Sequence, residues 1–187
     1  MLDIIDRNTV NGIDLTALGE VVQAVQQDPS QAKVAFHVTS RWRGQTRSET
    51  TVEAITLGGE RIERQFTIAA DEPDQLLGSN TAPNPQELLM AAVNACMMVG
   101  YVAGAATHGI TLEQLEIETK GELDLRGFLG LGDDVPPGYR EIDYDVRISG
   151  NGTPQQFAEI HQAVMATSPN YFNISRPVRL NGSLHVS

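Results

Sequence analysis

The chain has 187 residues, enough for one domain with a substantial core, and its 41% hydrophobic and 20% charged residues are typical of a globular protein. The formal net charge of -11 argues against duplex nucleic acid as a partner, because such a partner requires a basic face. The amino terminus lacks a basic segment followed by an apolar run, so we expect no signal peptide and a cytoplasmic protein.

The first helix is predicted at residues 11–28. These residues carry an apolar stripe at helical spacing and end just before Pro29. The stripe is narrow, which is typical of a helix packed on the outside of a domain. Three strands are predicted next, at about 33–41, 46–57 and 61–69, with turns at Gly44 and at Gly58-Gly59. Alternating Val34, Phe36 and Val38 indicate that the first strand is half-buried in an antiparallel meander.

A connection without periodicity, residues 71–84, leads into the longest apolar stretch of the chain, residues 84–107. Asn84 is suited to cap a helix there, with Pro85 in the first turn and Glu87 three residues after the cap. A helix that is apolar on nearly every side is either a buried central helix or a membrane span. Asn94 near its middle and the polar, acidic remainder of the chain favour the buried helix.

The remaining elements complete an α+β order with antiparallel sheets. We predict a strand at 110–125, a strand at 141–149, a helix at 153–167 and a final strand at 175–186. The glycine-rich loop between the first two, residues 126–139, has apolar side chains that either line an apolar ligand site or cover the core.

Cys96 is the only cysteine and the clearest candidate nucleophile, although cysteine often packs as a small buried hydrophobe. A reactive thiol needs a nearby cation or helix N-terminus, because the thiolate is the nucleophile. Cys96 lies roughly 18 Å along an ideal helix from Asn84, so a cation must come from elsewhere. The cluster Arg41, Arg43 and Arg47 is the densest source before the helix. No cysteine and histidine spacing is typical of a zinc site, and we expect neither a metal nor a cofactor.

Five segments together carry a family resemblance: DEP at 71–73, APNPQELLMAAVNAC at 82–96, TSRWRGQTRSE at 39–49, DLRGFLGLGDDVPPGY at 124–139 and ATSPNYFN at 166–173. They resemble the OsmC/Ohr family of osmotically inducible and organic hydroperoxide resistance proteins. The resemblance implies an OsmC-like domain at residues 33–187, preceded by an N-terminal helical extension at 1–32. It also implies an intertwined α+β homodimer, in which antiparallel sheets wrap around a long buried central helix and the active sites lie at the subunit interface.

The chemistry implied by the resemblance is that of a thiol peroxidase. A cysteine thiolate, held by an arginine and a glutamate, attacks the peroxide and becomes a sulfenic acid, which a second cysteine resolves as a disulfide. The family cysteine corresponds to Cys96, and the family arginine corresponds best to Arg47, with Arg43 as the second choice.

Two positions depart from the family pattern. Gln86 stands ten residues before Cys96, where the family has its glutamate, and Glu87 is displaced by one residue. Ser168, in the pair Ser168-Pro169, stands where the family has its second cysteine. Serine cannot form a disulfide, so any sulfenate at Cys96 would require an external thiol or dithiol, or would oxidise further.

The sequence therefore predicts a homodimeric peroxidase for small organic hydroperoxides, with Cys96 as the nucleophile. Arg47 would stabilise the thiolate, and Gln86 would be a neutral partner for that arginine. The alternative is a non-catalytic OsmC-like dimer that binds an apolar ligand or serves as a scaffold, because a relaxed site would also lose the carboxylate and the second cysteine. Neither nucleic acid nor a membrane is an expected partner.

Overall fold

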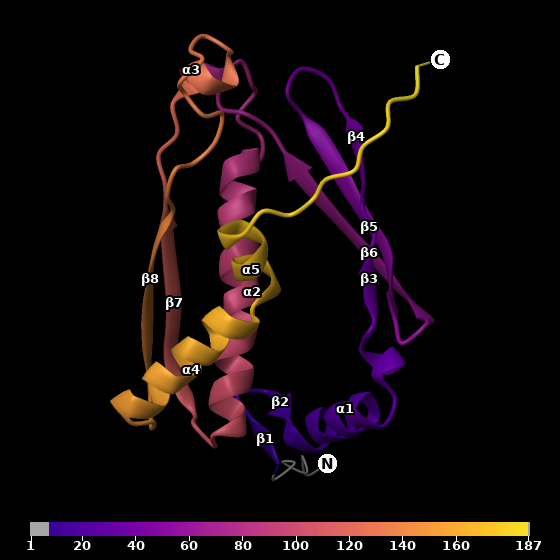
Figure 1. Ribbon diagram of the computed structural model, residues 1–187, viewed down its shortest axis with the longest axis vertical. Helices are drawn as coiled ribbons and strands as arrows, with labels where there is room; N and C mark the ends of the chain where they lie inside the picture. Colours follow the sequence, from indigo (N-terminus) through magenta and orange to yellow (C-terminus); the bar gives the residue numbers. More distant parts are fainter. Residues whose placement is uncertain (1–7, 187) are drawn as a thin grey trace. The chain divides into compact units, whose positions relative to one another are not determined.

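The structure, a computed structural model, describes residues 8–186 and consists of two compact units, Met1–Ala91 and Ala92–Ser187 (Figure 1). Helix α2, Pro85–Thr107, crosses the boundary between the units. Strands pair only in antiparallel ladders among the described residues, and helices occur in both units. The predicted α+β class with antiparallel sheets is therefore confirmed.

The first unit begins with a short hairpin, β1 (Thr9–Val10) and β2 (Ile13–Asp14), followed by α1 (Leu15–Gln27) and the 3-10 helix η1 (Pro29–Ala32). The Asp14 carboxylate caps α1 by accepting hydrogen bonds from the backbone N–H groups of Thr16 and Ala17. The observed helix thus starts four residues after the start of the predicted helix at 11–28, because residues 9–14 form the hairpin. Residues 1–7 of the predicted N-terminal extension lie outside the described residues.

The main sheet of this unit has strand β5 at its centre. Strands β3 and β4 pair with one edge of β5, and β6 pairs with the other edge; the bounds are β3 (Val34–Phe36), β4 (Thr39–Trp42), β5 (Ser48–Leu57) and β6 (Glu60–Ala70). The predicted meander is confirmed, but its first strand is two strands. Phe36 pairs with Ile55 whereas Thr39 already pairs with Thr51, so the ladder is interrupted at residues 37–38.

The faces of this sheet carry exposed apolar side chains in one chain. Phe36 is 74% exposed and Trp42 is 75% exposed, so the prediction of a half-buried first strand is wrong for the single chain. Within residues 8–91, Ala54 is the only hydrophobic side chain that is buried. An antiparallel sheet with an apolar face is stable only when that face is covered, and the described residues of the first unit leave Phe36 and Trp42 uncovered.

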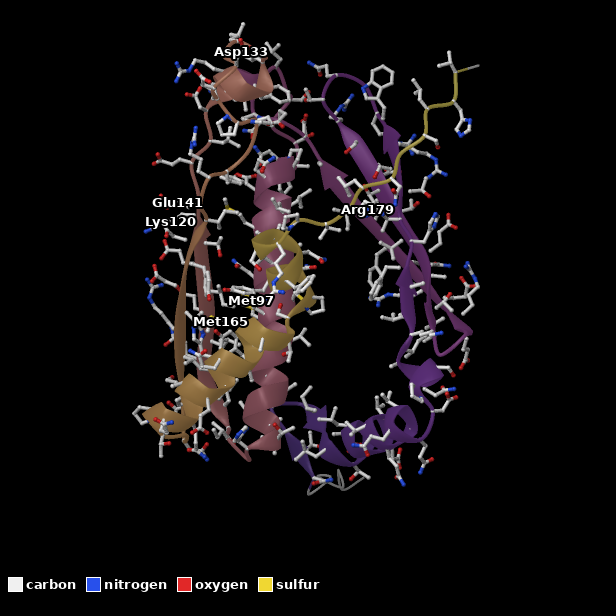
Figure 2. The ribbon with its side chains drawn as sticks, viewed as in Figure 1. Met97, Lys120, Asp133, Glu141, Met165 and Arg179 are labelled. Carbon is white, nitrogen blue, oxygen red and sulfur yellow. The ribbon has the colours of Figure 1, made fainter. Side chains whose placement is uncertain are left out.

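The second unit is built around the part of α2 that follows Ala91. A two-stranded antiparallel sheet, β7 (Leu112–Lys120) and β8 (Asp143–Gly150), and helix α4 (Pro154–Thr167) lie against α2 (Figure 1). The buried core joins these elements and consists of Met97, Tyr101, Ala105, Ile110, Ile117, Ile160 and Val164. Lys120, at the end of β7, and Glu141, just before β8, lie at the same end of this sheet (Figure 2).

Gly100 and Gly104 on α2 allow α4 to approach closely. A Cβ added at Gly104 would lie 3.0 Å from Cγ2 of Ile160, and one at Gly100 would lie 3.1 Å from Cγ2 of Val164. Both distances are shorter than ordinary side-chain contacts, so the two helices pack with a separation that alanine would disturb.

Helix α2 confirms the predicted long apolar helix and its cap. Asn84 Oδ1 accepts from Glu87 N and Glu87 Oε2 accepts from Asn84 N, both at 2.8 Å, which is a reciprocal capping box. By length and composition, with a mean hydropathy of 1.8 in its most apolar window, α2 could cross a bilayer, although core helices have the same properties. In one chain only one face is buried, whereas Val99 is 70% exposed.

The last part of the chain differs from its prediction. Helix α4 lies within the predicted range 153–167 and begins at Pro154 with a Thr153 cap, but Ser168-Pro169 starts a further, unpredicted helix, α5 (Pro169–Ser175). The short helix α3 (Leu125–Phe128) covers the end of the predicted strand 110–125 and the start of the predicted loop 126–139. The predicted strand at 175–186 is wrong for the single chain, because residues 176–186 have no ladder partner among the described residues.

Candidate active site

Cys96 and Ser168 meet where α2 contacts the turn between α4 and α5. The Ser168 hydroxyl donates a hydrogen bond to Sγ of Cys96 over 3.4 Å, although the two residues are 72 positions apart in the sequence. Cys96 is partly exposed, whereas Ser168 is only 6% exposed. Cys96 is therefore not fully buried, and its sulfur has an oriented polar partner, which a purely hydrophobic packing site would not provide.

The turn that holds Ser168 is fixed to α2 by a second side chain. Asn170 Nδ2 donates to the carbonyl oxygen of Ala92 over 2.9 Å, and Ala92 lies one helical turn before Cys96. Ser168 also accepts a hydrogen bond from Tyr171 N at 3.5 Å, as the cap of α5. Two side chains of one short turn thus contact the same turn of α2, so the position of the hydroxyl beside the sulfur is well determined.

The two candidate arginines differ in their surroundings within the first unit. Arg43 forms a salt bridge with Glu49 at 2.7 Å, and its backbone N–H donates to the carbonyl of Arg47 in the turn after β4. The exposed Arg47 side chain forms no ion pair with any residue between 8 and 186. Of the two guanidinium groups, that of Arg47 is therefore the one whose charge is not already paired.

Gln86 and Glu87 occupy the first turn of α2. The carboxylate of Glu87 is bound to the backbone N–H of Asn84 in the capping box, so it is engaged at the helix start. Gln86 is half-buried and lies ten residues before Cys96, about 15 Å along the helix axis. Arg47 and Gln86 belong to the first unit and Cys96 to the second. A contact of either residue with Cys96 therefore stays a prediction.

Asp71 organises the connection that leads into α2. Its carboxylate is 1% exposed and accepts from Thr46 Oγ1, Glu72 N and Ser79 N, and from both the backbone N–H and the hydroxyl of Thr81. The hydrogen bond from Thr46, followed by those from Thr81 and Glu72, holds the pKa of Asp71 well below its ordinary value. Because Thr46 precedes Arg47, this buried carboxylate also fixes the turn that carries the candidate arginine.

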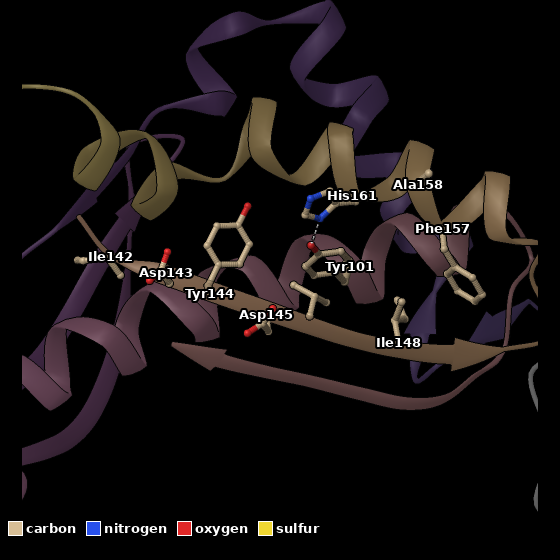
Figure 3. A pocket seen from close by; sticks show the side chains of 10 residues that line it. Tyr101, Ile142, Asp143, Tyr144, Asp145, Ile148, Phe157, Ala158 and His161 are labelled. Carbon is tan, nitrogen blue, oxygen red and sulfur yellow. Dashed lines mark hydrogen bonds between the residues drawn. The ribbon is translucent and has the colours of Figure 1, made fainter. Parts of the chain in front are cut away.

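A separate cavity of about 630 Å³ lies beside α4 and β8 in the second unit (Figure 3). Tyr101 and His161 meet at this cavity, where the phenol oxygen and Nδ1 share a hydrogen bond, and Tyr144, Phe157 and Ile148 supply apolar surface. Cys96 does not line the cavity. The cavity is thus a concave site separate from the thiol.

Some of these residues escape prediction from the sequence alone. Tyr101 and His161 are separated by 60 positions, and the donors to Asp71 are spread over residues 46–81, so no local spacing indicates either group. The pair Ser168-Pro169 does carry a signal, because serine followed by proline is typical of a helix cap and first position. No group of three or more metal-ligating side chains occurs among residues 8–186.

Comparisons with known proteins show the family and the fold of the chain. The family model described as OsmC-like protein matches residues 78–182, more than half of the chain. A search of the curated proteins found no match. The fold is similar to that of the OsmC-like protein from Mycoplasma pneumoniae, with 18% identity, a TM-score of 0.59, and 75% of this chain and 87% of that chain covered.

Two further solved structures are also similar. A putative osmotic stress induced and detoxification response protein from Psychrobacter arcticus has 14% identity and a TM-score of 0.54, with 72% of this chain and 84% of that chain covered. An OsmC-like protein of unknown function from Vibrio cholerae has 15% identity and a TM-score of 0.50, with 73% of this chain and 91% of that chain covered. At these identities the similarity concerns the fold.

Proposed function

Because the chain belongs to the OsmC-like protein family, we propose that it is a thiol-dependent peroxidase that reduces organic hydroperoxides through Cys96. The observation that carries the proposal is the partly exposed Cys96 thiol with the buried Ser168 hydroxyl directed at its sulfur. Ser168 is also the position at which the family resemblance places the second cysteine. The proximity of Ser168 to Cys96 supports this correspondence, with a hydroxyl in place of the second thiol.

The proposed reaction consumes one hydroperoxide and two thiols. The Cys96 thiolate attacks one peroxide oxygen, so that an S–O bond forms and the O–O bond breaks, and the departing alkoxide takes a proton to leave as an alcohol. An external thiol then displaces water from the sulfenic acid and forms a mixed disulfide with Cys96. A second external thiol releases the first one as a disulfide and regenerates the Cys96 thiol.

The reductant must come from outside the chain, since the sequence contains a single cysteine. A dithiol would complete the cycle within one reductant molecule, because its second sulfur is held near the mixed disulfide. Arg47 is proposed as the cation that stabilises the thiolate, with Gln86 as its neutral neighbour. Arg47 forms no ion pair among residues 8–186, which supports this choice over Arg43, which is bound to Glu49.

A homodimer is proposed as the active form. The uncovered apolar surface of each unit supports it: Phe36 and Trp42 in the first unit, and Val99 of α2 in the second, are all at least 70% exposed. Obligate interfaces cover surfaces of this kind and bury on the order of 2,000 Å² or more. Light scattering should give twice the chain mass of 20.3 kDa at micromolar concentration, and a folded monomer would contradict the dimer.

The test of the peroxidase is intact mass spectrometry after one equivalent of an organic hydroperoxide such as cumene hydroperoxide. The wild-type chain should gain one oxygen, a small dithiol should remove it, and Cys96→Ser should gain none. Loss of hydroperoxide should then continue with added dithiol over many equivalents. A folded wild-type protein whose mass is unchanged under excess hydroperoxide would exclude the peroxidase.

That outcome would favour the non-catalytic alternative, which one observation supports. The cavity beside Tyr101 and His161 has the size of a small-ligand pocket and apolar side chains in its wall. A ligand-binding OsmC-like protein would use that cavity and leave Cys96 as a packing residue.

A further inference from the structure

We propose that Ser168 is a catalytic residue that stabilises the Cys96 thiolate and the sulfenate formed from it. The inference deepens the proposed function, because it assigns a role to the residue that stands in place of a second cysteine. It starts from the direct contact of the Ser168 hydroxyl with the reacting sulfur, at 3.4 Å. A hydroxyl in this position cannot form a disulfide with a sulfenic acid, so any contribution of Ser168 to the reaction must come from the hydrogen bond itself.

The direction of that hydrogen bond follows from what else the Ser168 oxygen binds. A hydroxyl has one proton and two lone pairs, and one lone pair of Ser168 receives the backbone N–H of Tyr171 at 3.5 Å. The proton is then free to point at Sγ of Cys96. A thiolate is a much better acceptor than a thiol, so a donor in this place favours the charged form of the cysteine.

Burial and anchoring make the donor effective. Ser168 is only 6% exposed, so water does not compete strongly for its proton, and hydrogen bonds are stronger in such surroundings. Asn170 ties the same turn to the carbonyl of Ala92, and the ring of Tyr171 packs edge-on against Tyr144 at 6.2 Å. These contacts fix the turn from Ser168 to Tyr171. The hydroxyl is therefore already in position when the thiolate forms, at no further cost in conformational entropy.

The same contact remains useful after oxidation. When the sulfur carries a sulfenate oxygen, the Ser168 proton can bond to that oxygen or to the sulfur, and no covalent bond forms between the two side chains. The oxidised cysteine then stays open to an external thiol, whereas a cysteine at position 168 would close a disulfide. Ser168 thus has a positive role in a cycle with one cysteine, beyond preventing a disulfide at this position.

The experiment measures thiolate reactivity without any peroxide, so it does not depend on the peroxidase proposal. The rate of alkylation of Cys96 by iodoacetamide is recorded from pH 5 to pH 10 for wild type, Ser168→Ala, Ser168→Thr and Thr167→Val. Thr167 is the matched control, because its hydroxyl donates to the carbonyl of Ala163 in α4 and the residue adjoins Ser168.

Ser168→Ala should shift the pH profile of alkylation to higher pH by about one unit and lower the rate about tenfold at the acidic end, as expected for the loss of one hydrogen bond to a charged group. At alkaline pH, where the cysteine is ionised in both proteins, the rates should converge. Ser168→Thr should restore most of the profile, and Thr167→Val should match wild type. Better access to the sulfur in the alanine variant would instead raise the rate at every pH.

The proposal is overturned if the folded Ser168→Ala variant has the wild-type pH profile, or differs from it by the same factor at every pH. If the profile shifts as expected but wild type does not consume hydroperoxide, the peroxidase proposal fails and the role of Ser168 toward the thiolate stands. The alkylation profile thus tests the role of Ser168, and hydroperoxide consumption tests the peroxidase, so the two proposals can fail separately.

Discussion

The Tyr101 hydroxyl lies 2.5 Å from Nδ1 of His161, and this hydrogen bond joins α2 to α4. The two rings are stacked with their centroids 6.0 Å apart, and Tyr101 is only 1% exposed. Burial, followed by the effect of Tyr144, raises the pKa of Tyr101 to about 12 from its ordinary value of 10.0. The folded chain therefore keeps a phenol proton that the unfolded chain loses above about pH 10.

This raised pKa predicts the pH dependence of stability. A group whose pKa is higher in the folded state stabilises the fold fully below its unfolded pKa, and the effect is lost as the pH rises through the folded value. The free energy of unfolding should thus fall between about pH 10 and pH 12, by on the order of 2 kcal/mol for Tyr101. Tyr101→Phe should show a weaker fall than wild type in urea unfolding, whereas Tyr139→Phe, with its hydroxyl outside this contact, should behave as wild type. Equal slopes in all three proteins would show that Tyr101 titrates normally.

Gly104→Ala should destabilise the second unit. The added methyl would lie 3.0 Å from Cγ2 of Ile160, so α4 must shift or Ile160 must change rotamer, at a cost of about 1–3 kcal/mol. The gain in helix propensity, about 1 kcal/mol, offsets only part of this. Gly19→Ala in α1 is the matched control, because a Cβ there meets nothing within 4 Å and only the propensity gain remains. The midpoint temperature of thermal unfolding should fall for Gly104→Ala and rise for Gly19→Ala. The prediction fails if it rises for both variants.

Asp71→Asn should loosen the connection that leads into α2. The amide group replaces an acceptor oxygen that faces the N–H groups of Ser79 and Thr81, so at least one donor is left without a partner. Because the pKa of Asp71 is lowered, its stabilising effect is present above the unfolded pKa of about 3.8 and is lost as the pH falls through the folded value.

The measurement for this prediction is the difference in thermal unfolding between wild type and variant at several pH values. The difference should be largest near neutral pH and should shrink below about pH 4. Asp74→Asn is the control, since Asp74 is exposed in the same connection. A difference that is constant with pH would mean that the carboxylate charge does not matter.

Local rules account for two of the helix starts in this chain, because a capping box depends on neighbouring residues alone. The reciprocal pair Asn84 and Glu87 and the pair Thr153 and Gln156 both form as their spacing indicates. The pair Ser168-Pro169 also has the residue types of a helix start, yet no helix is predicted there from the sequence. Its serine caps the next helix, and its partner on α2, Cys96, is far away in the sequence.

Strand prediction from the local sequence fails at the end of the chain, because a strand also needs a hydrogen-bonded partner strand. Val178, Leu180, Leu184 and Val186 alternate as in a strand, yet these side chains are 51–92% exposed and residues 176–186 pair with no described strand. Alternation shows that a segment could be covered on one face, but pairing depends on an edge that the local sequence does not encode. The site is similar in this respect. Its being the only cysteine, together with the family resemblance, suggests Cys96 as a nucleophile, while its contact with Ser168 follows from the fold.

Ser168→Cys should convert the one-cysteine site into a two-cysteine site. The Ser168 oxygen is 3.4 Å from Cys96 Sγ, and a disulfide needs about 2.05 Å between its sulfurs, so a modest rotation of the two side chains is sufficient. After oxidation with diamide, the variant should lose two hydrogens in intact mass and resist alkylation, and a small dithiol should reverse both changes. Thr167→Cys is the matched control, because Thr167 binds Ala163 within α4 and should leave both thiols free. With one equivalent of cumene hydroperoxide, Ser168→Cys should form the disulfide, while wild type should stop at the singly oxygenated cysteine. Two free thiols in oxidised Ser168→Cys would show that the two side chains are not adjacent in solution.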